Sequence, residues 1–206
     1  MKTDVCIIGG GLAGLTAAID LSQKGHQVIV VEKNSYPKHK VCGEYISNEV
    51  LAYFDNLKFP LADLKPAAIN HLKLSNQKGQ VIEADLPLGG FGLSRYTFDH
   101  ALAQHATQNG ADLKIDSVKD VAFSIPADHF TLTCKSGLSI KAKVVIGAYG
   151  KRSKLDKSIN REFIMKKSPW IAFKAHYEIP DFPDQNVELH HFQNGYCGLS
   201  KTETGA

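Results

Sequence analysis

The feature that most constrains the fold is a strand–turn–helix–strand pattern within residues 2–33. An apolar run at Val5–Ile8 has the length of a buried strand, and glycines follow it at G-x-G-x-x-G spacing. A helical stretch then ends at Gly25, and a second apolar run, Val28–Val31, leads directly into an acid. This order predicts a parallel βαβ unit of the kind that binds dinucleotides.

Each position of the glycine motif has a chemical reason. Gly9 allows the tight turn, Gly11 lets the backbone approach a pyrophosphate, and Gly14 lets the helix lie close to the strand. The amino end of the helix, at Leu12 and Ala13, offers free N–H groups and a partial positive charge to the phosphates. A glycine-rich turn in another kind of α/β domain is the alternative, but the flanking strands and the terminal acid favour a dinucleotide site.

The acid at the end of the second strand selects the ligand. The carboxylate of Glu32, with Lys33 next to it, can accept both ribose hydroxyls of an adenosine. A 2′-phosphate about 4 Å from this carboxylate would cost about 4 kcal/mol per charge at an effective dielectric constant of about 20. That cost corresponds to roughly three decades of affinity. The site is therefore predicted to take FAD or NAD(H) rather than NADP(H).

Composition argues against several other classes of protein. The 206 residues carry 24 basic and 21 acidic side chains, and no long run of like charge suggests nucleic acid or a polybasic membrane contact. No apolar stretch approaches the ~20 residues of a membrane span, and Asp4 before a short apolar run argues against a signal peptide. The four scattered cysteines predict reduced thiols, no metal site and a cytoplasmic location. No feature specifies an oligomeric state.

The rest of the chain also has an α/β pattern. Helices are predicted over 48–56, with Ser47 as N-cap, and from residue 97 or 99 to Gly110. Strands are predicted at 69–74 and 81–86, which form a hairpin, and at 113–115, 118–123, 130–134, 139–143, 144–146, 170–179, 187–192 and 196–200.

Four motifs resemble the N-terminal part of a group of FAD-dependent oxidoreductases. This group joins the geranylgeranyl reductases with the flavin monooxygenases of the p-hydroxybenzoate hydroxylase fold. The motifs are the Val5–Glu32 unit, KVCGE at 40–44, R-x-x-F-D-x-x-L-A-x-x-A with a following Gly-Ala at 95–111, and VIGAYGKRS at 145–153. The resemblance implies FAD as cofactor, a reduced nicotinamide as external electron donor and a small-molecule substrate.

The resemblance also implies site residues. Cys42 becomes a candidate catalytic residue near the flavin, and Gly43 lies in the same motif. Arg95 can act as a cation toward the flavin or its phosphate, the backbone of Val118 can meet the adenine, and Gly147 closes the FAD domain. Each has a plainer alternative, which is packing for Cys42 and Val118 and solvent exposure for Arg95.

Other polar residues are interpreted structurally. Lys151 and Arg152 are expected in a solvated loop, and Trp170 in the core of a second sheet. His190 and His191 point to opposite faces of a strand, which is a poor arrangement for binding a metal. The sequence shows no obvious Ser-His-Asp set, so the flavin would have to supply the reactivity.

The expected fold is α/β. It comprises a Rossmann-like three-layer FAD/NAD(P)-binding domain with a β-meander over 1–164, including a hairpin insertion around 67–92, and the start of a mixed substrate-binding sheet over 165–206.

The chain departs from the family at three points. The fourth motif has Tyr149 in place of an acid, and the stretch at 196–200 has neither the Tyr-x-Trp-x-Phe-Pro signature of the reductases nor the Trp-x-Trp-x-Ile-Pro signature of flavin halogenases. The second FAD motif of the family, Gly-Asp-Ala, would fall after Ala206. We therefore expect a fragment that binds FAD weakly and associates through its second sheet. Three functions stay open: reduction of a C=C bond in an apolar or aromatic molecule, monooxygenation, and FAD binding without turnover.

Overall fold

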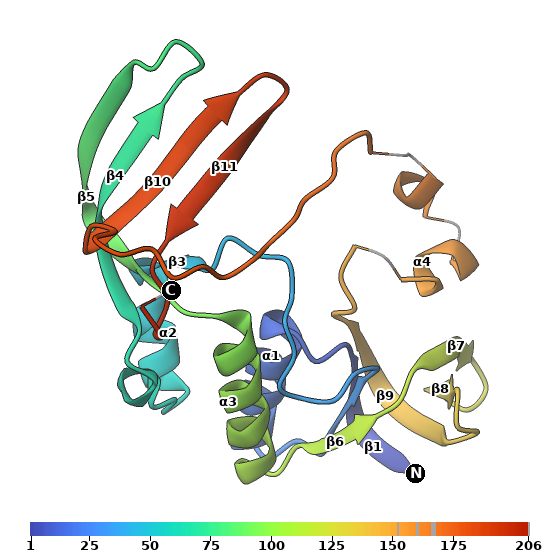
Figure 1. Ribbon diagram of the computed structural model, residues 1–206. Coiled ribbons are helices and arrows are strands. Elements are labelled where there is room, and N and C mark those ends of the chain that lie inside the picture. The colour runs from blue at the N-terminus through green and yellow to red at the C-terminus, as the bar shows by residue number, and fades with distance from the viewer. Residues whose placement is uncertain (152, 160, 166–167, 206) are drawn as a thin grey trace. The chain divides into compact units, whose positions relative to one another are not determined.

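The computed structural model of the protein forms two compact units (Figure 1). It describes residues 1–151, 153–159, 161–165 and 168–205. The first unit comprises Met1–Lys38 and Asp99–Ile171, and the second comprises His39–Phe98 and Ala172–Ala206. These units interleave along the sequence, whereas the two expected domains follow one another. The functional division at residue 164 stays a prediction.

A six-stranded sheet with the order β6-β2-β1-β9-β8-β7 organises the first unit. Its strands are β1 (Lys2–Ile8), β2 (Val28–Glu32), β6 (Asp112–Ile115), β7 (Val118–Ser124), β8 (His129–Cys134) and β9 (Ser139–Gly147). Strands β6, β2, β1 and β9 pair in parallel, and β9, β8 and β7 form an antiparallel meander. A parallel sheet that continues into a meander confirms the predicted α/β class.

The core of the first unit follows from the apolar runs of β1 and β2. All five residues of β2 are buried, as a strand within a parallel sheet requires. Helix α1 (Leu12–Gln23) contacts these two strands, and its Leu15, Ala18 and Ile19 are fully buried. A cluster around Cys6, with further residues from β2, β8 and β9, forms another part of this core.

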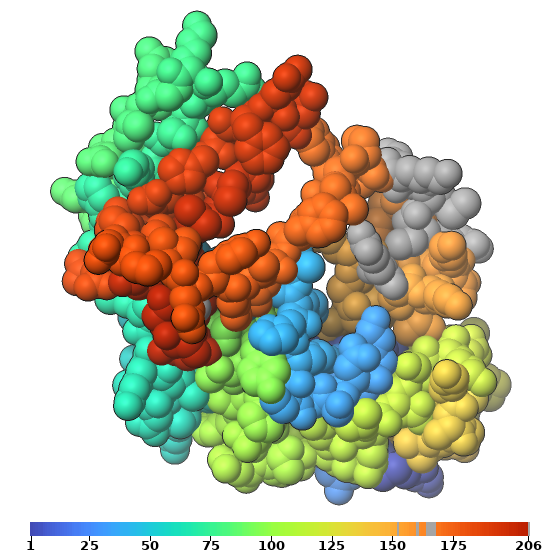
Figure 2. Space-filling model, viewed as in Figure 1, coloured from blue at the N-terminus to red at the C-terminus, as the bar shows by residue number. Residues whose placement is uncertain are grey.

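A five-stranded sheet with the order β11-β10-β4-β5-β3 organises the second unit. Its strands are β3 (Tyr45–Ser47), β4 (Ala67–Ser75), β5 (Val81–Gly92), β10 (Gln185–Phe192) and β11 (Gly195–Ser200). The predicted hairpin is present as β4 and β5, which pair antiparallel. Because β4 pairs in parallel with β10, the β4–β5 and β10–β11 hairpins lie side by side in one sheet (Figure 2).

The helices begin and end close to the predicted positions. The predicted helix over 48–56 is divided into a 3-10 turn, η1 (Asn48–Val50), and α2 (Leu51–Asn56), and Ser47 Oγ accepts the N–H of Glu49 as the predicted cap (3.5 Å). Helix α3 (Arg95–Gln108) begins earlier than predicted. The remaining short helices are η2 (Leu61–Leu64), α4 (Leu155–Ser158) and η3 (Glu162–Met165).

Two expectations about strands are wrong, and one strand was missed. Residues 170–179 form no strand, and Trp170 is 68% exposed rather than packed in a core. A strand needs a neighbour for its backbone N–H and C=O groups, and within the described residues none pairs with this segment. Residues 139–147 form one strand instead of two, and the short β3 was not predicted.

Candidate functional site

The turn between β1 and α1 is held by close backbone contacts. Gly9 has a φ of +107°, which other residues rarely adopt, and its N–H donates to the Val31 carbonyl (2.8 Å). A Cβ atom on Gly14 would collide with the Gly9 carbonyl oxygen, so a glycine is needed there for the helix to approach. Gly11, by contrast, has a φ of −91°, which any residue can adopt. Backbone conformation therefore does not explain the glycine at position 11.

The amino end of α1 has the properties of an anion site. In the described part of the chain, no side chain caps this end, and the first turn, which begins with Leu12 and Ala13, contains no acid. The N–H groups of a first helical turn have no acceptor within the helix. The helix dipole adds a partial positive charge at the same place. This end of α1 can therefore hold a phosphate.

Glu32 is buried among hydrogen-bond donors. Its Oε2 accepts the Gly10 N–H (2.8 Å), and its Oε1 accepts the Asn34 N–H (3.1 Å) and the Lys38 ammonium. Burial raises the pKa of Glu32, but these donors outweigh burial and hold the pKa below its usual value. A carboxylate has about four lone-pair positions, so about one remains for a ligand. Acceptance of two ribose hydroxyls would require Lys38 to withdraw.

Tyr36 and Lys38 are two residues of this site that sequence reasoning missed. The Tyr36 hydroxyl donates to the Gly10 carbonyl, and a Cβ atom on Gly10 would collide with that hydroxyl. The sequence offered one signal for the Tyr36 contact: Gly10 is a glycine, although the motif requires glycine only at the two positions beside it. Lys38 offsets the charge of Glu32. Glu32 therefore repels a 2′-phosphate less strongly than it would without this ion pair. Lys33 is exposed.

The end of β9 packs against the turn between β1 and α1. Gly147 is the last residue of β9, and the next N–H, that of Ala148, donates to the Ile8 carbonyl (2.8 Å). A Cβ atom on Gly9 would collide with the Ala148 carbonyl group. The structure therefore brings the first and the fourth sequence motifs together.

Tyr149 of the fourth motif lies next to an acid of α4, Asp156. The Tyr149 hydroxyl donates to Oδ1 of Asp156 (3.0 Å), which is buried. Burial and this carboxylate raise the pKa of Tyr149. The sequence could not reveal the pair, because the family motif places its acid at position 149 itself. Lys151 is exposed as expected, and Arg152 lies outside the described residues.

Val118 has a packing role. It is the first residue of β7, it pairs with Cys134 of β8, and its half-buried side chain packs against the core cluster around Cys6. This position is compatible with the plainer alternative. A contact between its backbone and an adenine stays a prediction.

Glu44, the third residue of the Cys-Gly-Glu motif, is a buried carboxylate of the second unit. It is 4% exposed and has a φ of +56°. Its Oε1 accepts the Arg95 N–H (2.5 Å) and the Lys174 ammonium, and its Oε2 lies 2.9 Å from Nε2 of His176. Burial raises the pKa of Glu44, but these three donors outweigh burial and hold the pKa below its usual value. One carboxylate thus joins a loop, a helix and a distant segment.

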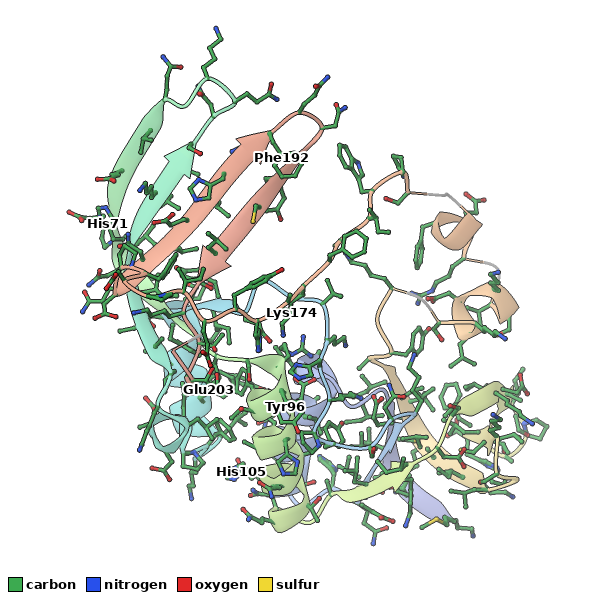
Figure 3. The ribbon with its side chains drawn as sticks, in the orientation of Figure 1. His71, Tyr96, His105, Lys174, Phe192 and Glu203 are labelled. Atoms are coloured by element: carbon green, nitrogen blue, oxygen red, sulfur yellow. The ribbon has the colours of Figure 1, made fainter. Side chains whose placement is uncertain are left out.

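A second carboxylate lies at the amino end of α3. Glu203 accepts the Ser94 N–H (2.8 Å), and its Oε1 also accepts the hydroxyls of Ser94 (2.5 Å) and Thr97 (2.6 Å) (Figure 3). Two negative charges at this end of the helix complement its dipole. Arg95 itself is 7% exposed, which excludes a solvated surface arginine. Caps from such distant residues explain why the sequence placed the start of α3 too late.

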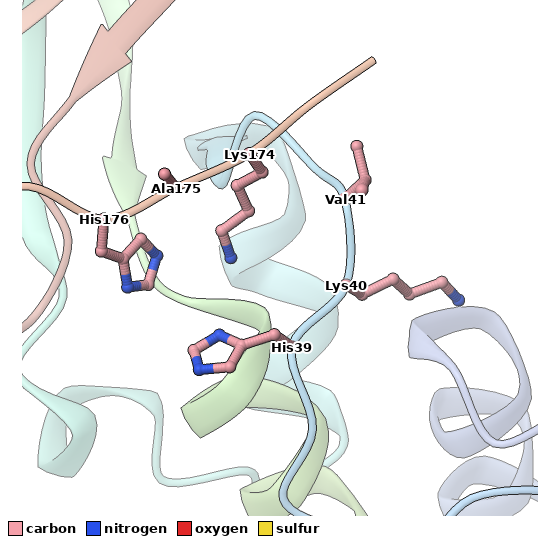
Figure 4. A pocket seen from close by; sticks show the side chains of 6 residues that line it. All are labelled: His39, Lys40, Val41, Lys174, Ala175 and His176. Atoms are coloured by element: carbon pink, nitrogen blue, oxygen red, sulfur yellow. The ribbon is translucent and has the colours of Figure 1, made fainter. Parts of the chain in front are cut away.

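A pocket of about 430 Å³ opens in the second unit. Its lining residues are His39, Lys40, Val41, Lys174, Ala175 and His176 (Figure 4). The His39 ring lies 4.7 Å from the Tyr96 ring and 5.5 Å from the His176 ring, centroid to centroid. Cys42 follows Val41 directly and is partly exposed, and Gly43 is exposed. The pocket therefore combines imidazole and ammonium groups beside the Cys-Gly-Glu motif.

The sheet of the second unit also gathers polar residues that the sequence left apart. Ser75 Oγ lies 2.8 Å from Nδ1 of His190, whose Nε2 lies 2.9 Å from Oε2 of Glu188. The sequence had revealed no such set, because Ser75 is far from the other two along the chain. Within the described residues, no group of three or more His, Cys, Asp or Glu side chains is placed to hold a metal ion.

The fold and the Gly9–Gly14 turn define a dinucleotide-binding protein of the Rossmann-like α/β class. The sequence matches the FAD binding domain family over residues 2–197, and the chain belongs to that family. This result confirms the resemblance drawn from the four motifs, and it confirms FAD as the expected cofactor.

The chain is similar to reductases and monooxygenases. The digeranylgeranylglycerophospholipid reductase of Methanosarcina acetivorans is 30% identical over 164 residues, which cover 74% of this chain and 39% of that protein. A flavoprotein/dehydrogenase from Cytophaga hutchinsonii has a similar structure, with a TM-score of 0.74, 20% identity and coverage of 100% of this chain and 54% of that one. For p-nitrophenol 4-monooxygenase from Pseudomonas putida, the TM-score is 0.67 at 20% identity, with coverage of 77% and 44%.

These structural matches show a shared fold. The chain spans well under half the length of the reductase that it matches. In the part of the chain that the structure describes, no helix has the length and apolar character needed to cross a membrane.

Proposed function

We propose that the protein is an FAD-dependent oxidoreductase that acts on an apolar or aromatic small molecule. The observation that carries the proposal is the contrast between the motif glycines. Gly9 and Gly14 are required by the backbone itself, whereas Gly11 has an ordinary conformation and precedes an uncapped helix end. Space for a pyrophosphate accounts for a glycine at position 11.

The residues of the dinucleotide turn fit an FAD molecule. We assign Gly11, Leu12 and Ala13 to the pyrophosphate, since they form the amino end of α1. Glu32 and Lys33 are assigned to the ribose, with the remaining lone pair of Glu32 as the first acceptor.

Further contacts are proposed from the family motifs. Gly147 is assigned to the closure of the turn, Val118 to the adenine, and Cys42, Gly43 and Arg95 to the flavin end. The burial of Arg95 supports a role beyond a surface charge. Bound FAD supplies two-electron redox chemistry.

The pocket of the second unit offers groups that can hold a proton. Reduction of a C=C bond adds a hydride equivalent to one carbon and a proton to the other. His176 is engaged by Glu44, whereas His39 lies exposed at the pocket wall. We therefore propose that His39 supplies the proton, because an imidazole ring at the pocket wall can act as a general acid toward a bound substrate.

Reduction of a C=C bond is our first candidate, and monooxygenation is the second. The Cys42 motif and the similarity to a named reductase support reduction. The absence of the Tyr-x-Trp-x-Phe-Pro signature at residues 196–200, and the fold shared with a monooxygenase, support oxygenation. FAD binding without turnover is the third candidate.

We further propose a reduced nicotinamide as external electron donor and a cytoplasmic location. All four cysteines are unpaired, which is the usual state in a reducing compartment.

The test is FAD titration of the wild type, Gly11→Val and Ala127→Val. Valine suits the backbone conformation at position 11, so Gly11→Val should keep the thermal midpoint of the ligand-free protein while FAD affinity falls at least tenfold. Ala127 lies in an exposed turn, so Ala127→Val controls for added methyl groups. Equal flavin occupancy in the wild type and Gly11→Val would refute the assignment of the phosphate site.

Product masses then separate the three candidates. The FAD-loaded protein is incubated with a reduced nicotinamide and an isoprenoid or aromatic substrate, and products are analysed by mass spectrometry. A gain of two hydrogen atoms supports reduction, and a gain of one oxygen atom supports monooxygenation. FAD binding with neither product supports FAD binding without turnover.

A further inference from the structure

Four polar side chains gather on one face of the sheet in the second unit. Strand β4 contributes Lys73 and Ser75, and strand β10 contributes Glu188 and His190. The parallel register places Ser75 opposite His190 and Lys73 opposite Glu188. Side chains of alternate residues share a face of a strand, so the four lie together. None of them belongs to the dinucleotide turn or to the pocket of the second unit.

The hydrogen bonds order these groups as nucleophile, base and orienting acid. An ionised Glu188 can only accept, so Nε2 of His190 carries the hydrogen in the contact of 2.9 Å. Nδ1 of the neutral ring is then an acceptor, and the Ser75 hydroxyl donates to it over 2.8 Å. Glu188 is 7% exposed, while Ser75 and His190 are partly exposed. A buried acid thus orients a base that a small molecule can reach.

We propose that Ser75, His190 and Glu188 form an acyl-transfer site that takes small activated esters and works without FAD. The arrangement has the roles of a serine–histidine–acid triad, with the two ring nitrogens exchanged. Lys73 Nζ lies 3.9 Å from Oε1 of Glu188. Its positive charge, two residues from Ser75 on the same face, stabilises negative charge that develops on the carbonyl oxygen of an ester.

The step balances within these groups. Ser75 Oγ bonds to the acyl carbon while its proton passes to Nδ1 of His190. The ester C–O bond then breaks, and the leaving oxygen takes that proton as an alcohol. Water repeats the sequence on the acyl-serine and releases the carboxylic acid. A single ammonium offers less stabilisation than a set of oriented backbone N–H groups, so acylation should be easier to detect than turnover.

The experiment measures covalent labelling of the full chain by an alkyl fluorophosphonate, followed by peptide mapping. One label on Ser75 is expected in the folded protein, with labelling lost in urea. Ser75→Ala should abolish the label. His190→Gln should slow labelling by at least a hundredfold, within the range of general-base contributions, and Glu188→Gln should slow it at least tenfold.

Two variants are matched controls. His71 lies on the same strand and face and contacts Asp85 (3.2 Å), so His71→Gln removes an imidazole that orients no serine (Figure 3). Ser200 of β11 pairs with Val187, so its side chain lies on the opposite face of the sheet from Glu188 and His190. Ser200→Ala therefore removes a serine that is not next to His190. Both should label at the wild-type rate, and far-UV circular dichroism checks the fold of every variant.

Three results would overturn the proposal. These are a label that maps to another residue, a Ser75→Ala protein that labels like the wild type, and a His71→Gln protein that is slowed as much as His190→Gln. Labelling is measured without FAD, so its failure leaves the proposed oxidoreductase function untouched.

Discussion

Replacement of Glu44 by glutamine should destabilise the protein strongly, although no sequence motif marks this residue as structural. The amide keeps an oxygen for the Arg95 N–H but removes the charge that faces Lys174 and His176. The Lys174 side chain is only 12% exposed, so its ammonium would lose its partner in a largely buried place. Breaking a buried pair costs about 3–5 kcal/mol. Because some solvent still reaches Lys174, we expect about 3 kcal/mol, and Glu44→Ala should lose about 1 kcal/mol more with the helix cap.

Urea unfolding followed by far-UV circular dichroism measures this loss. Hydrogen exchange by mass spectrometry locates it, since the first turn of α3 should lose protection. Glu83→Gln is the control, because Glu83 is 56% exposed and its contact with His71 is 4.0 Å long. Such a surface pair contributes about 0–1 kcal/mol. A Glu44→Gln protein within about 0.5 kcal/mol of the wild type, or one no less stable than Glu83→Gln, would refute the reasoning.

The stability difference between the wild type and Glu44→Gln should also depend on pH. The folded protein holds the pKa of Glu44 below its ordinary value of 4.5. The ionised carboxylate therefore contributes fully to stability above the unfolded-state pKa, and this contribution is lost as the pH falls through the folded-state pKa. The difference in unfolding free energy between wild type and Glu44→Gln should be largest near neutral pH and should shrink below 4.5. A difference that stays constant into acid would contradict the assignment of an ionised Glu44.

Three further predictions concern Gly14, the Glu32–Lys38 pair and Cys6. Gly14→Ala should lower the thermal midpoint, because the added Cβ atom would collide with the Gly9 carbonyl oxygen. Gly43→Ala is the control, since its Cβ atom would lie in open space and should leave the midpoint unchanged. Equal midpoints for the two variants would count against the close approach of the helix to the strand. Lys38→Met should increase the preference for ADP over 2′-phospho-ADP at least severalfold, measured by competition with FAD, because it leaves the charge of Glu32 unscreened. Burial raises the pKa of Cys6 to about 12, so its thiol should react with a thiol reagent only after unfolding, and a fast reaction in the folded protein would argue against burial.

The sequence alone determined the parallel core and the dinucleotide turn. Both depend on patterns within about thirty residues, in which apolar runs, glycines and a terminal acid succeed one another at fixed spacing. The meander was also predictable, because its strands are consecutive. Glu32 was predicted to be the ribose acid from its place at the end of β2, but its ion pair with Lys38 was not predicted, because the loop between them has no periodic pattern.

Only the tertiary structure decided the organisation of the second unit. Glu44, Glu203 and the amino end of α3 meet although they are distant along the chain, and no local pattern announces a cap supplied from so far away. The same is true of Ser75 and His190, which become neighbours because two hairpins pair in parallel. The segment 170–179 shows the converse: its alternation is that of a strand, but within the described residues it has no neighbour. A local pattern sets the preference of a segment, whereas a strand, a helix cap or a catalytic set exists only when distant backbone and side-chain groups complete its hydrogen bonds.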